Sequence, residues 1–315
     1  MLSFADIAAA RARVAADVHR TPILPASRLG APAGVRLWLK AELLQKTGSF
    51  KVRGALNALR QLSADERRRG VVGVSAGNHA QALAWAARAV GAPCTVVMPA
   101  AAVQAKLDAT RGYGATVIQH QWGSAMFDKA RELAEEHGYL FIHPFDDPRV
   151  VAGAGTTAME IVEDLPDVDA IVVPVGGGGL LSGIAVAAKH LRPSVRVFGV
   201  EPEGAQALRR SLDAGRVTAI DAPRTIADGL AAPMTTELPF EIARRWVDDV
   251  IVVSDDEIVH AMRAILASAK LLAEPAGAAG VAAVLAGRLP VAAGARVAAV
   301  VSGGNVDLEK LKSLL

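Results

Sequence analysis

Residues 170–188 read AIVVPVGGGGLLSGIAVAA, a run of 19 residues without a charged side chain. Its length matches a membrane-spanning helix, but Pro174 and the four successive glycines at its centre would break such a helix. A β-branched run, a glycine turn and an Ala-rich run predict instead a strand at 170–175, a loop, and a helix at about 180–190. The segment is therefore interpreted as one strand–loop–helix unit of a soluble protein.

The same unit recurs along the chain, because short β-branched runs alternate with longer helical patterns. We predict strands at 35–40, 71–74, 95–98, 115–118, 140–142, 196–200, 250–253 and 296–301. We predict helices at 4–18, 51–62, 78–90, 102–111, 124–137, 148–164, 239–246, 255–270 and 275–286. Short apolar strands separated by helices indicate parallel βαβ units, so the predicted fold class is α/β with open sheets. The region 201–237 is expected to be irregular.

Composition excludes several classes of function. Lys and Arg outnumber Asp and Glu by only two among 315 residues, which gives no reason to expect a nucleic-acid or membrane partner. The single cysteine, Cys94, cannot form an intrachain disulfide and lies in a strand pattern typical of a buried residue. The N-terminus lacks the basic start and apolar run of a secretory signal. We therefore predict a cytoplasmic protein.

Three loops that contain glycine follow predicted strands: Ser75 to His79, Gly176 to Gly179, and Ser302 to Asn305. Ligands of open α/β sheets bind at such strand ends. Four successive glycines are entropically costly, and a tight turn needs only one or two of them. Their N–H groups can converge on an anion at the start of a helix, which favours a phosphate.

The spacing of the glycines indicates which class of phosphate-bearing ligand the loop can bind. Ser182 stands where the third glycine of a Gly-x-Gly-x-x-Gly motif would be, and no Gly-x-x-x-x-Gly-Lys motif occurs. A nicotinamide oxidoreductase and a nucleoside-triphosphate enzyme thereby lose their usual support. A cofactor with one terminal phosphate remains.

Lys51 begins a predicted helix, within the segment 46–55 that reads KTGSFKVRGA. A cation at this end of a helix opposes the helix dipole. If the surroundings are apolar, the amine could have a lowered pKa and bond covalently to an aldehyde. The alternative is a solvated surface lysine.

The strings TGSFKVRGA (47–55), SAGNHAQ (75–81), GGGG (176–179) and SGGN (302–305) occur in this order. Together with TIADG (225–229) and LLAEP (271–275), they resemble the threonine dehydratase and serine racemase family of fold type II pyridoxal-phosphate enzymes, over essentially the whole chain. The resemblance implies two open, twisted parallel-sheet α/β domains with the cofactor in the cleft between them. Residues 1–48 and 147–315 would form the large domain and 49–146 the small one. A homodimer or higher homo-oligomer is expected, since dimers are common in this family.

The resemblance also implies the roles of individual residues. Lys51 would hold pyridoxal phosphate covalently and then act as acid and base. The ring would contact Phe50, Asn78 and Ser302, of which Asn78 would bind its 3-oxygen and Ser302 would face its nitrogen. The phosphate would rest on Gly176, Gly177, Gly178, Gly179 and Leu180. The amino acid substrate would bind at Ser75, Ala76, Gly77 and His79, although His79 could equally be a helix-start residue satisfied by the backbone. Glu274 is expected near the ring.

Two of these positions favour one reaction. A serine at position 302 cannot keep the pyridine nitrogen protonated as a carboxylate would, which suits a reaction whose carbanion is quickly discharged by loss of a β-hydroxyl. Ala76 stands where mammalian-type serine racemases carry a serine, and a methyl group cannot donate the second proton that racemisation needs. The predicted activity is β-elimination by a threonine and serine ammonia-lyase (dehydratase), which gives a 2-oxo acid and ammonia.

Several alternatives stay open. The substrate could be another β-hydroxy amino acid, such as 3-hydroxyaspartate or a hydroxyectoine-derived compound, the enzyme could be a serine racemase, or the chain could be a catalytically silent binding protein. Glu201 matches the first carboxylate of the divalent cation site of the family's racemases, but Ala207 replaces an aspartate there. The chain ends at Leu315, soon after the Ser302 loop, without the regulatory domain of biosynthetic dehydratases, which favours a catabolic role.

Overall fold

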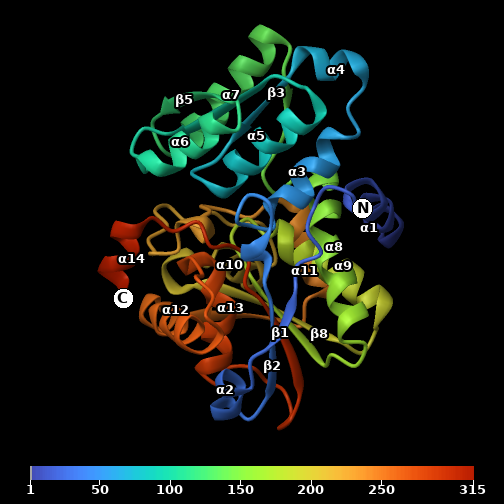
Figure 1. Cartoon of the computed structure of the whole chain (residues 1–315), viewed down its shortest axis with the longest axis vertical. Coiled ribbons are helices and arrows are strands. Elements are labelled where there is room, and N and C mark those ends of the chain that lie inside the picture. Colours follow the sequence, from blue (N-terminus) through green and yellow to red (C-terminus); the bar gives the residue numbers. More distant parts are fainter. Residues whose placement is uncertain (1) are drawn as a thin grey trace.

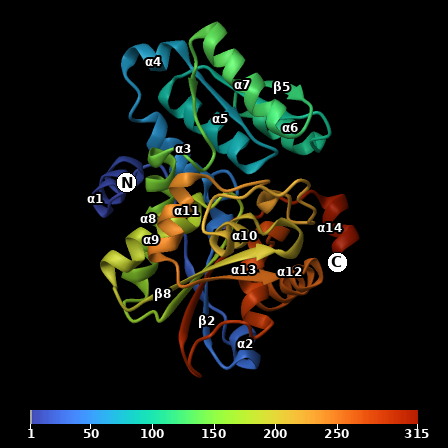
Figure 2. The same ribbon diagram turned by 180° about the vertical axis from the view of Figure 1, so that it is seen from behind.

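The computed structural model describes residues 2–315, which form two stacked bodies (Figure 1). One body is built on a six-stranded sheet and the other on a four-stranded sheet. Helix α3 (Lys51–Leu59) lies where the two bodies meet, and the view from behind shows the same arrangement (Figure 2). The predicted α/β class with two open parallel sheets is confirmed.

The six-stranded sheet has the order β1-β2-β10-β7-β8-β9. Its strands are β1 (Ile23–Pro25), β2 (Arg36–Lys40), β10 (Arg296–Val300), β7 (Ala170–Pro174), β8 (Arg196–Pro202) and β9 (Asp249–Val253). All neighbours are parallel except β1, which pairs antiparallel with β2. β1 was not predicted, because three residues are too few to show a period.

Alternating side chains of β7 explain why its sequence is continuously apolar. Ala170 and Val172 belong to one hydrophobic cluster, whereas Ile171 and Val173 belong to another. The first cluster is covered mainly by α12 (Asp255–Ala269) and α13 (Pro275–Leu285), and the second by α1 (Phe4–Val14), α8 (Pro148–Asp164) and α9 (Gly179–Leu191). Both faces of the sheet are therefore buried, as the β-branched runs predicted.

The four-stranded sheet is wholly parallel, with the order β5-β4-β3-β6. Its strands are β5 (Thr116–His120), β4 (Cys94–Pro99), β3 (Val71–Val74) and β6 (Leu140–Phe141), with the helices α4 (Ala64–Arg69), α5 (Asn78–Val90), α6 (Gln104–Gly112) and α7 (Ser124–His137) around it. Cys94 is buried in β4, and burial raises the pKa of its thiol to about 12. It behaves as a core side chain and not as a nucleophile.

Several predicted elements have the observed bounds, and others were missed. The helices α5, α7 and α8 begin and end where the pattern placed them. The region predicted to be irregular, 201–237, contains the end of β8, α10 (Ala207–Ala214) and the start of α11 (Glu237–Trp246). The other elements are α2 (Ser27–Gly30), α14 (Leu308–Leu314) and the 3₁₀ turns η1 (Ala31–Ala33), η2 (Glu42–Leu44), η3 (Glu203–Ala205) and η4 (Asp228–Leu230).

The domain bounds at 48/49 and 146/147 stay a prediction. All four strands of the smaller sheet fall within 49–146, which is consistent with them. Helix α3 nevertheless packs closely on α8, since a Cβ atom at Gly54 would lie 2.5 Å from the Val150 carbonyl oxygen. The reciprocal glycine, Gly153 of α8, leaves room for the backbone of Arg53. These glycines fix the helix that begins with Lys51 against the larger body.

Within residues 2–315 no helix is long and apolar enough to cross a membrane. The uncharged stretch 170–188 folds as β7, the glycine loop and most of α9, as predicted.

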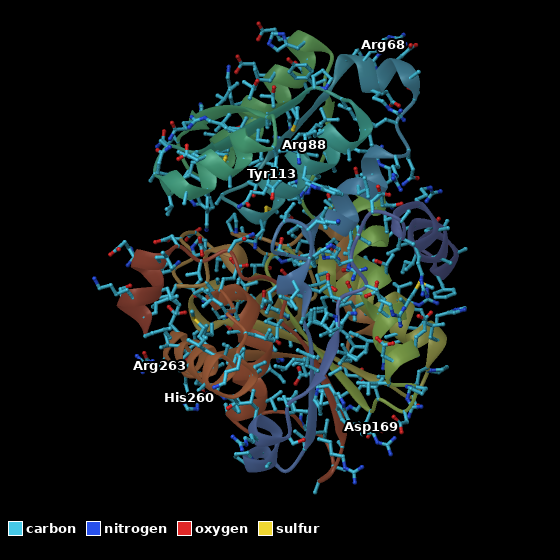
Figure 3. The ribbon with its side chains drawn as sticks, in the orientation of Figure 1. Arg68, Arg88, Tyr113, Asp169, His260 and Arg263 are labelled. Carbon is cyan, nitrogen blue, oxygen red and sulfur yellow. The ribbon has the colours of Figure 1, made fainter. Side chains whose placement is uncertain are left out.

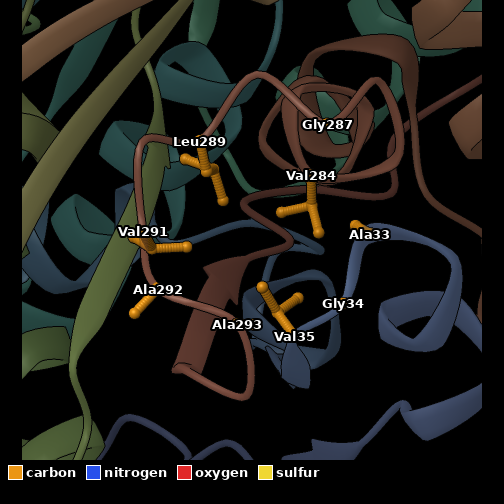
Figure 4. A pocket seen from close by; sticks show the side chains of 9 residues that line it. All are labelled: Ala33, Gly34, Val35, Val284, Gly287, Leu289, Val291, Ala292 and Ala293. Carbon is orange, nitrogen blue, oxygen red and sulfur yellow. The ribbon is translucent and has the colours of Figure 1, made fainter.

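A cavity of about 270 Å³ lies beside the end of α13, and none of the predicted site residues lines it. Val35, Val284, Leu289 and Val291 point into it (Figure 4). Its lining carries no charged side chain, so it offers no group for the predicted chemistry.

Candidate active site

Two loops that are far apart in the sequence pair beside Lys51. Ser49 forms an antiparallel bridge with Gly303, and the Phe50 N–H donates to the Ser302 carbonyl at 3.1 Å. The Gly304 N–H donates to the Gly48 carbonyl at 2.9 Å. Position 302, at the end of β10, is thereby brought next to the start of α3, as the predicted site requires.

Lys51 is the first residue of α3 and is half-buried. Its Nζ donates to the Pro144 carbonyl at 3.0 Å and lies 5.2 Å from the centre of the Phe50 ring. Within residues 2–315 no carboxylate forms an ion pair with this amine. Burial lowers the pKa of Lys51 to about 8 because the charged form loses hydration without gaining a counter-charge. The amine is therefore a better nucleophile near neutral pH than an exposed lysine.

Asn78 stands at the start of α5, within a chain of side-chain hydrogen bonds. Its Nδ2 donates to Glu274 Oε1 at 2.5 Å, and its Oδ1 accepts from Asn305 Nδ2 at 2.9 Å. Asn305 Nδ2 also donates to the Thr47 carbonyl at 2.7 Å. Burial raises the pKa of Glu274 to about 7, although the bond from Asn78 opposes this shift. The amide of Asn78 is thus held in one orientation between the two paired loops.

The four glycines between β7 and α9 are closely covered. A Cβ atom at Gly177 would overlap the ring of Phe145, and one at Gly176 would lie 3.0 Å from the Gly229 carbonyl oxygen. Gly178 has φ +98°, a backbone conformation that residues other than glycine rarely adopt. The tetrad therefore requires glycine for its geometry, and it leads directly into the N-terminus of α9.

The loop 143–146 joins the glycine tetrad to Lys51. Pro144 accepts the hydrogen bond from Lys51, and the next residue, Phe145, packs on Gly177 and Gly179. A half-buried amine thus lies beside a loop of backbone N–H groups at a helix N-terminus. These are the groups that an aldehyde with a terminal phosphate would need, so the residues fit pyridoxal phosphate.

The predicted substrate loop, Ser75 to His79, joins β3 to α5. Ser75 Oγ accepts from the Gly77 N–H at 3.0 Å, and Ala76 is half-buried between them. Neither ring nitrogen of the buried His79 makes a hydrogen bond of normal geometry, although the Ile142 backbone lies nearby. Burial, together with the charge of Lys51, lowers the pKa of His79 to about 3. The imidazole is therefore neutral, and it is not satisfied as an ordinary helix-start residue would be.

Glu201 does not join these residues. Its two carboxylate oxygens accept from the N–H groups of Leu208 and Arg209, at 2.9 and 2.8 Å, at the start of α10. Burial raises its pKa to about 7. Among residues 2–315 no three His, Cys, Asp or Glu side chains are grouped so as to hold a metal ion. The role of Glu201 as a metal ligand stays a prediction, and its visible contacts are those of a helix-terminal anion.

Three residues near the site received no role from the sequence. His143 Nδ1 accepts from the Asp146 N–H at 2.9 Å, which shapes the loop that holds Lys51. Lys106 of α6 and Asp228 of η4 form an ion pair between the two bodies. The position of His143 directly after a predicted strand was a usable signal. No local sequence pattern could have predicted the pair of Lys106 and Asp228, because these residues are 122 positions apart.

Comparisons with known proteins agree with this geometry. A family model described as "Pyridoxal-phosphate dependent enzyme" matches residues 14–303. The L-threonine ammonia-lyase of Thermotoga maritima is 46% identical over 319 residues, which cover 100% of this chain and 78% of the relative. An L-threo-3-hydroxyaspartate ammonia-lyase of a Pseudomonas species is 43% identical, over 99% of this chain and 98% of the relative.

A solved structure gives the same fold. The serine racemase of maize superposes with a TM-score of 0.95 at 38% identity, over 99% of this chain and 96% of that one. The similarity thus extends across both sheets and all the loops described above.

Proposed function

Because the chain belongs to the family of pyridoxal-phosphate dependent enzymes, we propose that it is an ammonia-lyase for L-threonine and L-serine. The reaction breaks the Cα–H and Cβ–O bonds of the substrate and releases water. The resulting enamine takes up water, which gives a 2-oxo acid and ammonia. The observation that carries this proposal is the half-buried amine of Lys51, without a counter-charge, beside the glycine tetrad.

The residues that would hold the cofactor follow from the site. Lys51 would bond to its aldehyde carbon, and Gly176 to Gly179 with Leu180 would bind its phosphate through backbone N–H groups. Phe50, Asn78 and Ser302 would contact the ring. When bound, pyridoxal phosphate supplies a conjugated ring that delocalises the negative charge developing at the substrate α-carbon.

Lys51 is also the proposed acid and base. With a pKa of about 8, its Nζ can take the proton from the α-carbon and give one to the departing hydroxyl near neutral pH. Ser75, Ala76, Gly77 and the neutral His79, at the N-terminus of α5, would bind the substrate carboxylate.

Ala76 distinguishes elimination from racemisation. Its methyl group cannot protonate the α-carbon from the side opposite Lys51, as a serine hydroxyl at this position could. A 2-oxo acid is therefore the expected product, with D-serine at most minor.

The experiment is a substrate panel with the purified protein and pyridoxal phosphate. We expect L-threonine to release 2-oxobutanoate and ammonia, and L-serine to give keto acid faster than D-serine. Borohydride reduction followed by peptide mapping should place the cofactor on Lys51. A label on another lysine, or D-serine formed faster than keto acid, would overturn the proposal.

The phosphate loop has its own test. Gly177→Ala should lower the affinity for pyridoxal phosphate by about tenfold or more, since the new methyl group must displace Phe145. Gly112→Ala is the matched control, because nothing lies within 4 Å of the Cβ position there. Equal affinities for the two variants, measured by titration of the apoprotein, would remove the tetrad from the cofactor site.

We also propose that the protein is cytoplasmic and forms a homodimer or a higher homo-oligomer. A single buried cysteine suits a reducing compartment. Sedimentation of the purified chain would give its oligomeric state.

A further inference from the structure

The loop 143–146 carries the chain from one body of the molecule to the other. It follows β6 of the four-stranded sheet and leads to Asp147, whose side chain caps the first turn of α8 in the larger body. Two groups of the loop reach the proposed cofactor site. The Pro144 carbonyl accepts from Lys51 Nζ at 3.0 Å, and Phe145 covers the glycine tetrad. The shape of the loop therefore decides where both groups lie.

The imidazole of His143 closes this loop from within. Its Nδ1 accepts from the Asp146 N–H at 2.9 Å and, at the longer distance of 3.4 Å, from the Phe145 N–H. These bonds enclose Pro144 and so fix the direction of its carbonyl, as the side chains of Asn and Asp do in other turns. The far end of the loop is anchored to the larger body, because Thr236 Oγ1 donates to Asp146 Oδ1 at 2.7 Å.

Three aromatic rings hold the imidazole in place. The centre of the His143 ring lies 5.5 Å from that of Phe127 in α7 and 5.9 Å from that of Phe141 in β6. The ring of Phe145, 4.7 Å away, meets it edge to face. The acceptor atom is thus fixed by the body of the four-stranded sheet, whereas the N–H of Asp146 belongs to a residue anchored on the other body.

The imidazole is neutral at the pH at which the site would work. Burial lowers the pKa of His143 to about 4. The carboxylates of Asp146 and Asp147 favour a proton on the ring, and the cations Lys51 and Arg131 oppose it. Since burial has the largest effect, the ring has one proton, which is on Nε2 because Nδ1 is the acceptor.

We infer that His143 is a positioning residue for Lys51, because the hydrogen bond that it accepts holds the Pro144 carbonyl against the free amine. Under the proposed function, on which this inference rests, Lys51 has a free amine when it captures the cofactor and again once the substrate has displaced it. The closed loop also limits the access of water to this half-buried amine, which disfavours its charged form.

Two replacements of His143 separate its hydrogen bond from its ring contacts. His143→Asn keeps an acceptor, because its Oδ1 is bonded to Cγ as Nδ1 is, whereas His143→Leu has none. Both lose the ring contacts. His260→Leu is the matched control, since His260 lies on the exposed face of α12 (Figure 3). Borohydride trapping of pyridoxal phosphate on the full-length apoprotein, at a series of pH values, measures the capture rate of each protein.

We expect the capture rates of the wild type, His143→Asn and His260→Leu to level off near a pH of about 8. The rate of His143→Leu should level off at a higher pH and be lower by about tenfold near neutral pH, since each unit of rise in the pKa of Lys51 lowers the unprotonated fraction about tenfold. A loss of stability alone would lower the rate at every pH and leave this pKa unchanged. An unchanged pKa in His143→Leu, or an equal shift in His143→Asn, would overturn the inference.

The wild-type protein provides a second test, which does not depend on the folding of His143→Leu. Nitrogen NMR of isotope-labelled histidine side chains reports which ring nitrogen carries the proton. The signals of His143 are those that disappear in His143→Asn. We expect the proton on Nε2, and a proton on Nδ1 would contradict the inference.

The failure of the inference differs from that of the proposed function. If the wild-type apoprotein captures the cofactor on Lys51 and His143→Leu leaves the pH profile unchanged, only the inference is wrong. If the wild-type protein captures no cofactor, the proposed function fails first.

Discussion

Lys51 and Arg53 stand two residues apart on the first turn of α3, and their surroundings are opposite. Arg53 is fully buried and forms paired hydrogen bonds of 2.7 to 2.8 Å with both Glu42 and Glu160. These carboxylates raise its pKa, whereas burial lowers that of Lys51 to about 8. Within residues 2–315 the amine of Lys51 donates to the Pro144 carbonyl and pairs with no carboxylate.

The cluster around Arg53 is also balanced in charge. Lys40 Nζ donates to Glu160 Oε2 and to the Thr21 carbonyl, both at 2.6 Å, so two cations face two carboxylates. The cluster joins β2, η2, α3 and α8, which fixes the turn from which Lys51 projects. The comparison teaches that one helix turn contains a compensated charge that stabilises the fold and an uncompensated amine that is available for chemistry.

The largest expected effect is on activity. Lys51→Met should lower the rate of ammonia release by about 10³-fold or more, because it removes both the covalent anchor and the acid–base group. The apoprotein should be as stable as the wild type or more so, since a half-buried uncompensated cation disappears. Assays and urea unfolding would check both parts, with the exposed Lys46→Met as control. A marked loss of stability would contradict the comparison.

Arg53→Met should have the reverse pattern. Removing one partner of a buried charge cluster leaves the carboxylates of Glu42 and Glu160 facing a single cation, Lys40, and we expect a loss of about 3–5 kcal/mol in the free energy of unfolding. Arg60→Met, at the C-cap of the same helix, breaks a half-exposed pair with Asp17 and should cost about 1 kcal/mol or less. Equal losses in denaturant titrations of the two variants would show that the buried Arg53 cluster stabilises the fold no more than the half-exposed Arg60–Asp17 pair does.

The smallest expected effect is the pH dependence of the rate at which the apoprotein captures the cofactor. Only the unprotonated amine can capture the cofactor, so the capture rate of the apoprotein should rise about tenfold per pH unit below a pKa of about 8 and then level off. An ordinary lysine would continue this rise toward its usual pKa of 10.5. Borohydride trapping at a series of pH values measures the rate.

The ionisation of Lys51 should also make the free energy of unfolding of the apoprotein depend on pH. Between pH 8 and 10.5 the unfolded chain binds the Lys51 proton and the native apoprotein does not. The contribution of this lysine to the free energy of unfolding therefore rises with pH in that window. The Lys51→Met variant should lack this contribution, and a slope that is the same in both proteins would assign it to other groups.

The sequence predicted most of the fold because its signals are local. The helices α5, α7 and α8 were placed by their helical sequence patterns, and the buried strands by β-branched runs. β1 and α10 were missed, since the first spans three residues and the second lies in a stretch rich in turn-forming residues. Pairing with β2 and packing against β8 and α11 define these two elements.

The candidate site was predicted in part for the same reason. The lysine at a helix start and the glycine tetrad after a strand are visible in short stretches of sequence. The packing of Phe145 on Gly177 and the hydrogen bond from Lys51 to Pro144 depend on how the two bodies meet. Such contacts have no local pattern.

By itself, the sequence determined the α/β class, the order of strands and helices along the chain, and the residue types at the ends of the strands. Each of these follows from propensity and periodicity over a few residues. The tertiary structure alone decided which charges are compensated, because the partners come from distant segments. Glu160 reaches Arg53 across 107 positions, and Asp228 reaches Lys106 across 122. Burial and pairing together set the chemistry of each group, and both exist only once the chain is folded.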